Sequence, residues 1–185
     1  MIRQLEPDDA LLYVDFIAGP HFGHAPDWSG CYCRFYQAEV SHQAWLARTS
    51  EDNRKEAIAE IEAGRMKGYL VFDGELCVGW CNANDTTAFY RVREEFLPYT
   101  AEGNFGATMC FVIHADYRGQ GLARRMLKQI VNDYKTMGYA GMLALPFESK
   151  ENPEKRYRGT KKMYEELGYQ QVAEDDGVFI MKLVF

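Results

Sequence analysis

The stretch MCFVIHADYRGQGLA, residues 109–123, joins an apolar run to a glycine-rich turn. The run at 109–113 predicts a buried strand. After the turn, apolar residues recur at helical spacing, with basic residues on the opposite face. These apolar residues are Leu122, Met126, Leu127, Ile130, Val131 and Tyr134. The stretch therefore predicts a strand, a tight turn and a helix in succession.

A strand, a tight turn and a helix start together form a suitable site for an anion. The first N–H groups of a helix have no partner within it, and the helix dipole adds positive potential there. Gly119 and Gly121 have no β-carbon, so a ligand can come close to the main chain. Arg118 can bind phosphate oxygens in bidentate fashion. We predict a phosphate ligand, although residues 118–123 alone also fit a simple turn that connects a strand to a helix.

Two common phosphate motifs do not fit residues 118–124. A P-loop needs lysine where Leu122 stands, and the dinucleotide fingerprint needs a small residue where Arg124 stands. The pattern that remains is Arg/Gln-x-x-Gly-x-Gly/Ala, which Arg118, Gly121 and Ala123 satisfy. It resembles the acyl-coenzyme A pyrophosphate loop of the GNAT superfamily of N-acetyltransferases.

Length and composition limit the class of protein. A chain of 185 residues suits a single domain, 1–185, and its net charge of −6 argues against nucleic acid as a partner. No apolar run approaches the roughly 20 residues that span a bilayer, and no signal peptide is visible, so we expect a cytoplasmic protein. The Cys31-x-Cys33 pair lacks the second pair that a zinc site needs, and we expect no metal.

The pattern along the chain alternates between short strands and helices. A resemblance to the GNAT fold implies an α/β (α+β mixed) domain with a central, mostly antiparallel twisted sheet of 6–7 strands, splayed in the middle and flanked by about four helices. Expected strands are residues 2–6, 31–36, 68–72, 76–82, 107–113, 140–145, 169–173 and 177–184. Expected helical segments are residues 9–18, 42–47, 54–63, 86–96, 122–137 and 160–167.

A second motif lies one strand after the loop. Residues 163–169, MYEELGY, resemble the GNAT helix that ends Tyr-x-x-x-Gly-Phe/Tyr, in which the tyrosine hydroxyl faces the coenzyme sulfur. By this resemblance Tyr164 is the catalytic residue that assists the departing thiolate. The alternative is that Tyr164 is an ordinary core aromatic. The resemblance covers residues 68–185 well and the N-terminal third only by element order.

The same resemblance implies where acetyl-coenzyme A binds as co-substrate. The expected contacts are Phe111, Val112, Ile113, Arg118, Gly119, Gln120, Gly121, Leu122, Ala123 and Tyr157. Tyr157 stands where relatives often have Asn, so the contacts at that helix start are expected from Tyr157, Arg158 or Lys161 instead. The strand before the loop lacks the glutamate that some relatives use as general base. Candidates for that base are Asp85, Glu94, Glu95, Glu102 and His114.

We expect an enzyme that moves an acetyl group directly to a primary amine of a small molecule or peptide. The acceptor pocket is expected in insertions at about 20–53 and 83–106, which combine aromatic residues with scattered acids. The alternative is that those aromatics only pack the insertions on the sheet. Two other functions remain open: a non-catalytic acyl-coenzyme A sensor or interaction module, and a transferase for another acyl group. Composition is compatible with a monomer or a homodimer.

Overall fold

The computed structural model describes residues 1–22, 26–148 and 153–185. Its centre is a seven-stranded sheet with the order β1-β2-β3-β4-β5-β7-β6, in which only β4 and β5 are parallel. This confirms the expected mostly antiparallel sheet. The strands are β1 (Ile2–Gln4), β2 (Gly68–Asp73), β3 (Leu76–Asp85), β4 (Phe105–Ile113), β5 (Gly141–Ala144), β6 (Gln170–Asp175) and β7 (Val178–Val184).

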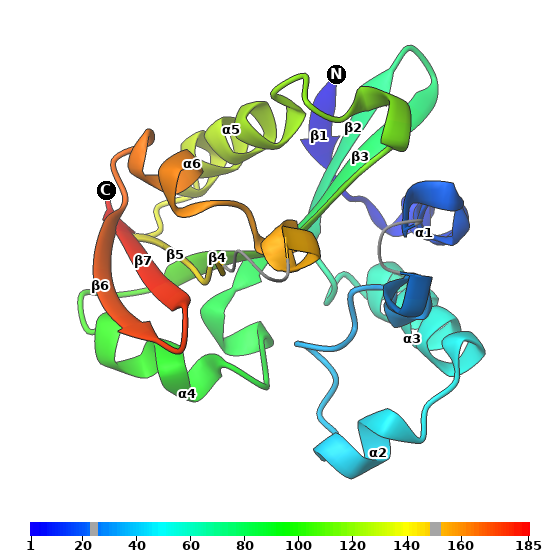
Figure 1. Cartoon of the computed structure of the whole chain (residues 1–185), viewed down its shortest axis with the longest axis horizontal. Coiled ribbons are helices and arrows are strands. Elements are labelled where there is room, and N and C mark those ends of the chain that lie inside the picture. The colour runs from blue at the N-terminus through cyan, green and yellow to red at the C-terminus, as the bar shows by residue number, and fades with distance from the viewer. Residues whose placement is uncertain (23–25, 149–152) are drawn as a thin grey trace.

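Helices cover both faces of the sheet, with α1 and α3 on one side and α5 and α6 on the other (Figure 1). The described segments contain six α-helices, whereas about four were expected; three of the six have only four or five residues. The bounds are α1 (Ala10–Ala18), α2 (His42–Leu46), α3 (Ser50–Glu62), α4 (Arg93–Phe96), α5 (Leu122–Thr136) and α6 (Lys161–Glu165). None of the helices in these segments is long and apolar enough to cross a bilayer.

Capping explains where two of the helices begin. Thr49 accepts a hydrogen bond from the Asp52 main chain, and the Asp52 side chain accepts from Thr49 in return. This capping box starts α3 at Ser50, four residues before the expected start at Arg54. Thr160 caps α6 in the expected place by accepting from the Met163 N–H group.

The expected strand at 31–36 is wrong. A short 3-10 helix (Pro26–Cys31) leads into a turn, and the Arg34 N–H group donates to the Cys31 carbonyl at 2.9 Å. Tyr32 and Cys33 adopt left-handed φ angles of 45° and 52°. An aromatic run favours a strand by propensity alone, but this run packs its side chains into the core instead. Residues 149–152, in the charged segment before α6, lie outside the described residues.

The central strand β4 carries a bulge where the sheet opens. Register with β3 shifts between the pairs Cys81↔Phe111 and Ala83↔Thr108, which gives β4 one extra residue at Met109 and Cys110. As a result these two neighbours both pack into the same core cluster. Pairing of β4 with β5 ends at Thr108↔Ala144, so the rest of β4 has no partner from β5. The sheet is therefore splayed in the middle, as expected.

Candidate active site

A cavity of about 1130 Å³ runs along the unpaired part of β4. One end reaches the turn before α5, and the other end reaches α2 and the segment before it. The lining residues from the C-terminal part are Cys110, Phe111, Val112, Ile113, Tyr117, Arg118, Gly119, Gly121, Leu122, Ala123, Arg124, Arg156, Tyr157, Gly159, Thr160 and Met163. The structure thus brings all of the expected coenzyme contacts except Gln120 to one cavity; their binding role stays a prediction.

The turn before α5 leaves space above its main chain. Gly119 and Gly121 have φ angles of +73° and +74°, and a β-carbon on either would meet no atom within 4 Å. Gly121 is the N-cap residue of α5, so the free N–H groups of the first helical turn follow it directly. Arg118 lines the cavity here, and its Nε atom donates to the Ile113 carbonyl at 3.2 Å. This geometry suits an anionic ligand.

Gln120 points away from the cavity. Its side-chain amide donates to the Asp116 carbonyl at 3.0 Å and braces the turn from outside. Arg124, which was not among the expected contacts, does line the cavity and pairs with Glu166 at 2.9 Å. Four arginines of the described chain therefore line the cavity: Arg118, Arg124 and Arg156 from the C-terminal part, and Arg48 from the segment at 20–53.

The free edge of β4 supplies main-chain groups along the cavity wall. The His114 N–H group donates to the Val78 carbonyl on β3 at 2.9 Å. Because main-chain groups alternate in direction along a strand, those of Phe111 and Ile113 face the edge that β5 has left. Such groups can hydrogen-bond an extended ligand in the place of a missing strand.

Tyr164 lies at the closed end of the gap between β4 and β5. Its side chain is completely buried, and its hydroxyl lies 2.8 Å from the Arg158 carbonyl, to which it donates, and 3.0 Å from Thr108 Oγ1. Thr108 is the last β4 residue paired with β5. Burial raises the pKa of the Tyr164 hydroxyl above its ordinary value. The ring does not line the cavity; its neighbours Gly159, Thr160 and Met163 do.

The opposite wall of the cavity is aromatic; its role in binding an acceptor stays a prediction. It comes from the segment at 20–53, whereas no described residue of the segment at 83–106 lines the cavity. Its aromatic members are Phe22, Trp28, Tyr32, Phe35, Tyr36 and Trp45. Tyr157 closes this wall, since its hydroxyl lies 2.8 Å from that of Tyr36 and Trp28 packs edge-on against its ring.

The acids expected in this wall are elsewhere. No carboxylate occurs among the described lining residues, and none of the candidate bases does either. Asp85 accepts hydrogen bonds from Tyr139 and Lys67 at another cavity, and Glu102 pairs with Lys182. Glu94 and Glu95 lie on α4, and His114 accepts from the Asp116 main chain. The described residues also include no group of three or more metal-ligating side chains that could hold an ion.

Sequence reasoning missed the cysteines of this site. Cys31, Cys33 and Cys110 all line the cavity, and Cys33 reaches it from the strained turn described above. The bulge that places Cys110 there has no local signal, since bulges depend on pairing with another strand. The sequence shows the spacing of Cys31 and Cys33, but it does not indicate that Cys110, 77 residues after Cys33, lines the same cavity.

Comparison with known proteins agrees with this geometry. The family model described as the acetyltransferase (GNAT) domain matches residues 69–171, which is more than half of the chain. A sequence comparison with curated proteins gave no match.

Several solved structures share the fold. A GNAT-family acetyltransferase from Listeria monocytogenes has a TM-score of 0.62 at 14% identity, covering 100% of this chain and 94% of that one. The yncA protein of Salmonella typhimurium, solved with its cofactor acetyl-CoA, has a TM-score of 0.53 at 14% identity, covering 100% and 92%. A polyamine N-acetyltransferase of Drosophila melanogaster gives 0.56 at 11%, covering 100% and 99%.

These likenesses show the fold, and the family match extends over the turn before α5, the free edge of β4 and Tyr164. The chain therefore belongs to the GNAT acetyltransferase family and is an acetyltransferase.

Proposed function

We propose that this enzyme transfers the acetyl group of acetyl-coenzyme A directly to a primary amine. The single observation that carries the proposal is the continuous cavity that joins the turn before α5, the free edge of β4 and the aromatic wall. The pyrophosphate of the coenzyme binds at Gly119 and Gly121 with Arg118. The pantetheine arm follows Phe111–Ile113, and an N–H group near Ile113 stabilises the thioester oxygen as negative charge develops on it.

Tyr164 assists the leaving thiolate in this mechanism. Its position beside Thr108, where β4 and β5 part, supports the role. To act, the hydroxyl exchanges its hydrogen bond with the Arg158 carbonyl for one to the departing sulfur. Because burial raises the pKa of this hydroxyl, hydrogen bonding to the thiolate is favoured over full proton transfer.

The acceptor is an amine carried on an aromatic or apolar body. The wall formed by Phe22, Trp28, Phe35 and Trp45 supports this, since aromatic rings pack against the apolar body of such an amine. A polyamine would need several counter-charges, and the described lining offers none. No described carboxylate in the cavity acts as base, so the amine arrives after losing its proton to solvent.

Turnover with an amine panel tests the function. Purified protein is incubated with acetyl-coenzyme A and either 2-phenylethylamine or spermidine, and free coenzyme A thiol is followed. With amine present, we expect each protein chain to release many molecules of free coenzyme A. We also expect a higher kcat/KM for 2-phenylethylamine than for spermidine. Tight coenzyme binding without turnover on any amine would instead indicate a sensor. Faster turnover with a longer acyl thioester would change the acyl group assigned.

A further inference from the structure

Three of the five cysteines line the cavity, and the acetyl transfer proposed above uses none of them. They are Cys31, Cys33 and Cys110. Cys77 and Cys81 are buried elsewhere on β3. The three cavity thiols come from two segments that are far apart in the sequence, so the fold itself has gathered them.

Cys33 sits in a strained turn that the surrounding structure holds in place. Neither it nor Tyr32 is a glycine, yet both have left-handed φ angles. The Tyr13 hydroxyl donates to the Tyr32 carbonyl at 2.9 Å, and the Asn82 amide donates to the Cys33 carbonyl at 3.3 Å. Strain of this kind persists where neighbours over-determine the conformation, and it occurs often at functional sites.

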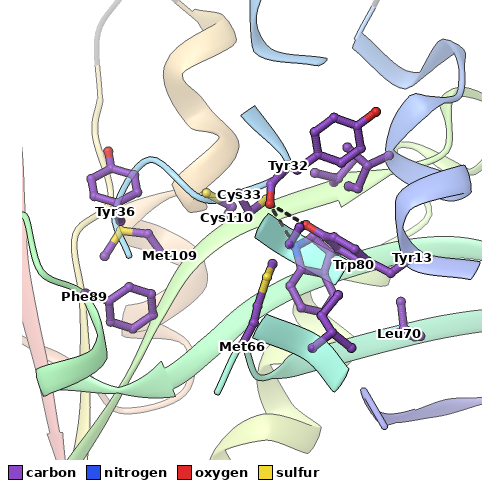
Figure 2. Close-up of a cluster of buried hydrophobic side chains, with 14 of the residues drawn as sticks. Tyr13, Tyr32, Cys33, Tyr36, Met66, Leu70, Trp80, Phe89, Met109 and Cys110 are labelled. Carbon is purple, nitrogen blue, oxygen red and sulfur yellow. Dashed lines mark hydrogen bonds between the residues drawn. The ribbon is translucent and has the colours of Figure 1, made fainter. Parts of the chain in front are cut away.

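The sulfur of Cys33 is surrounded by hydrogen-bond donors. Trp80 Nε1 lies 3.3 Å from Cys33 Sγ, and an indole N–H can only donate, so the sulfur accepts this bond. Cys110 is a second neighbour of this sulfur, and hydrogen bonding with it lowers the pKa of Cys33. Figure 2 shows the Cys33 and Cys110 side chains next to each other beside Tyr13 and Trp80. Donors around a sulfur stabilise its thiolate form.

This environment distinguishes Cys33 from the other thiols. The hydrogen bond with Cys110, helped by that with Trp80, lowers the pKa of Cys33 in spite of burial. Burial raises the pKa of Cys31 to about 12 and that of Cys77 to about 11, and the pKa values of Cys81 and Cys110 are raised as well. Since the thiolate is the nucleophilic form, the donor at its sulfur favours Cys33 as the nucleophile among the cavity thiols.

Cys33 also lies beside the place proposed for the thioester. Its partner Cys110 occupies the β4 bulge and directly precedes Phe111, where the pantetheine arm is proposed to begin its contacts. Both cysteines line the same cavity as the turn before α5. A thioester held along this edge therefore shares the cavity with the Cys33 sulfur.

We propose that Cys33 is an acyl-accepting residue, which takes the acetyl group from coenzyme A thioester bound in this cavity when no amine is present. The Cys33 thiolate attacks the thioester carbonyl, a new carbon–sulfur bond forms, and the bond to the coenzyme sulfur breaks. Coenzyme A leaves as a thiolate and takes the proton that Cys33 gave up. The exchange replaces one thioester by another, so it is reversible and leaves the direct route to amines open. The inference rests on the proposed binding of acetyl-coenzyme A.

Peptide mass spectrometry of the full chain tests this directly. Reduced wild-type protein is incubated with acetyl-coenzyme A without amine, quenched in acid and digested. We expect acetyl on Cys33 at more than ten times the level on Cys77, lost on treatment with hydroxylamine or excess free coenzyme A. Cys33→Ser is expected to abolish this label, and Cys77→Ala, which changes a thiol outside the cavity, to leave it unchanged. Thermal unfolding of both variants verifies that they fold.

Two results would overturn the inference. If wild-type protein turns over an amine but Cys33 carries no acetyl group, Cys33 is not an acceptor and the proposed function stands. Equal labelling of Cys33 and Cys77 would show that acetyl-coenzyme A reacts with the thiols of this protein nonspecifically, and the inference would be wrong. If neither Cys33 nor any amine receives acetyl, the proposed function fails together with the inference. All of these readings come from the wild-type protein and need no variant to fold.

Discussion

Replacing Tyr164 by Phe removes one hydroxyl from a completely buried ring. That hydroxyl hydrogen-bonds with the Arg158 carbonyl at 2.8 Å and with Thr108 Oγ1 at 3.0 Å. Each such bond contributes about 0.5–1.5 kcal/mol, so the free energy of unfolding should fall by about 1–3 kcal/mol. The ring itself stays, and its edge-on contact with Tyr169 at 5.2 Å is kept.

Tyr169→Phe is the matched control. The Tyr169 hydroxyl is also buried, but it has no hydrogen-bond partner in the described part of the chain. Removing it relieves the cost of a buried unsatisfied group, so the free energy of unfolding should stay unchanged or rise by about 1 kcal/mol. Urea unfolding of the two variants compares the two rings, which lie in contact in the same core cluster.

Activity separates the structural role of Tyr164 from the catalytic one. A hydroxyl that assists a leaving group contributes about 10²–10⁴ in rate, so Tyr164→Phe should lower kcat about 10²-fold with a smaller change in the coenzyme KM. A loss of 1–3 kcal/mol leaves a domain of ordinary stability, about 5–15 kcal/mol, folded, so unfolding does not explain such a decrease. Equal kcat in Tyr164→Phe and wild type would remove Tyr164 from the mechanism. Equal unfolding of both variants would refute the hydrogen-bond argument.

Two further predictions concern the turn before α5 and the N-terminus. Gly121→Ala should cost about 1–2 kcal/mol of stability because φ is +74°, and it should raise the coenzyme Kd more than tenfold in calorimetry. Gly64→Ala introduces the same strain, at φ +68°, outside the cavity. An equal rise in the coenzyme Kd of this control would contradict the proposal that the coenzyme binds at the turn before α5. Arg3, which donates to Asp9 at 2.7 Å, lowers the pKa of Asp9 by hydrogen bonding. This stabilisation is full above the ordinary carboxyl pKa and is lost as pH falls through the lowered value. The free energy of unfolding of Asp9→Asn should therefore depend less steeply on pH below about pH 4 than that of wild type. If urea unfolding gives the same pH dependence for both proteins, the pair of Arg3 and Asp9 does not stabilise the fold in this way.

Local patterns were enough to predict most of the elements. The apolar runs at 68–72 and 76–82 predicted β2 and β3, and the periodicity after Leu122 predicted α5. Helix starts were less well placed where a cap was overlooked, as at Thr49. The aromatic run at 31–36 misled the interpretation, because its propensity for a strand yields to packing of Tyr32, Cys33 and Tyr36 in the core.

The candidate site likewise contains residues that the local sequence predicts and residues whose placement depends on tertiary packing. Arg118, Gly119 and Gly121 could be predicted as an anion site from the sequence because a strand, a tight turn and a helix start are consecutive, and this geometry needs no distant residue. The aromatic wall of the cavity was predicted only in part. Acids and aromatics alternate in the sequence, but the sequence does not tell which of them face inward.

By itself, the sequence determined the strand–turn–helix junction at 109–136 and the family to which the chain belongs. These depend on residues in direct succession, whose φ angles and free N–H groups follow from local chemistry. Only the tertiary structure decided that Cys33 meets Cys110 and Trp80, and that the Tyr164 hydroxyl meets Thr108. Those contacts join residues 47 to 77 positions apart. They exist because the β4 bulge and the packing of both sheet faces select one arrangement among many that the same residues could adopt.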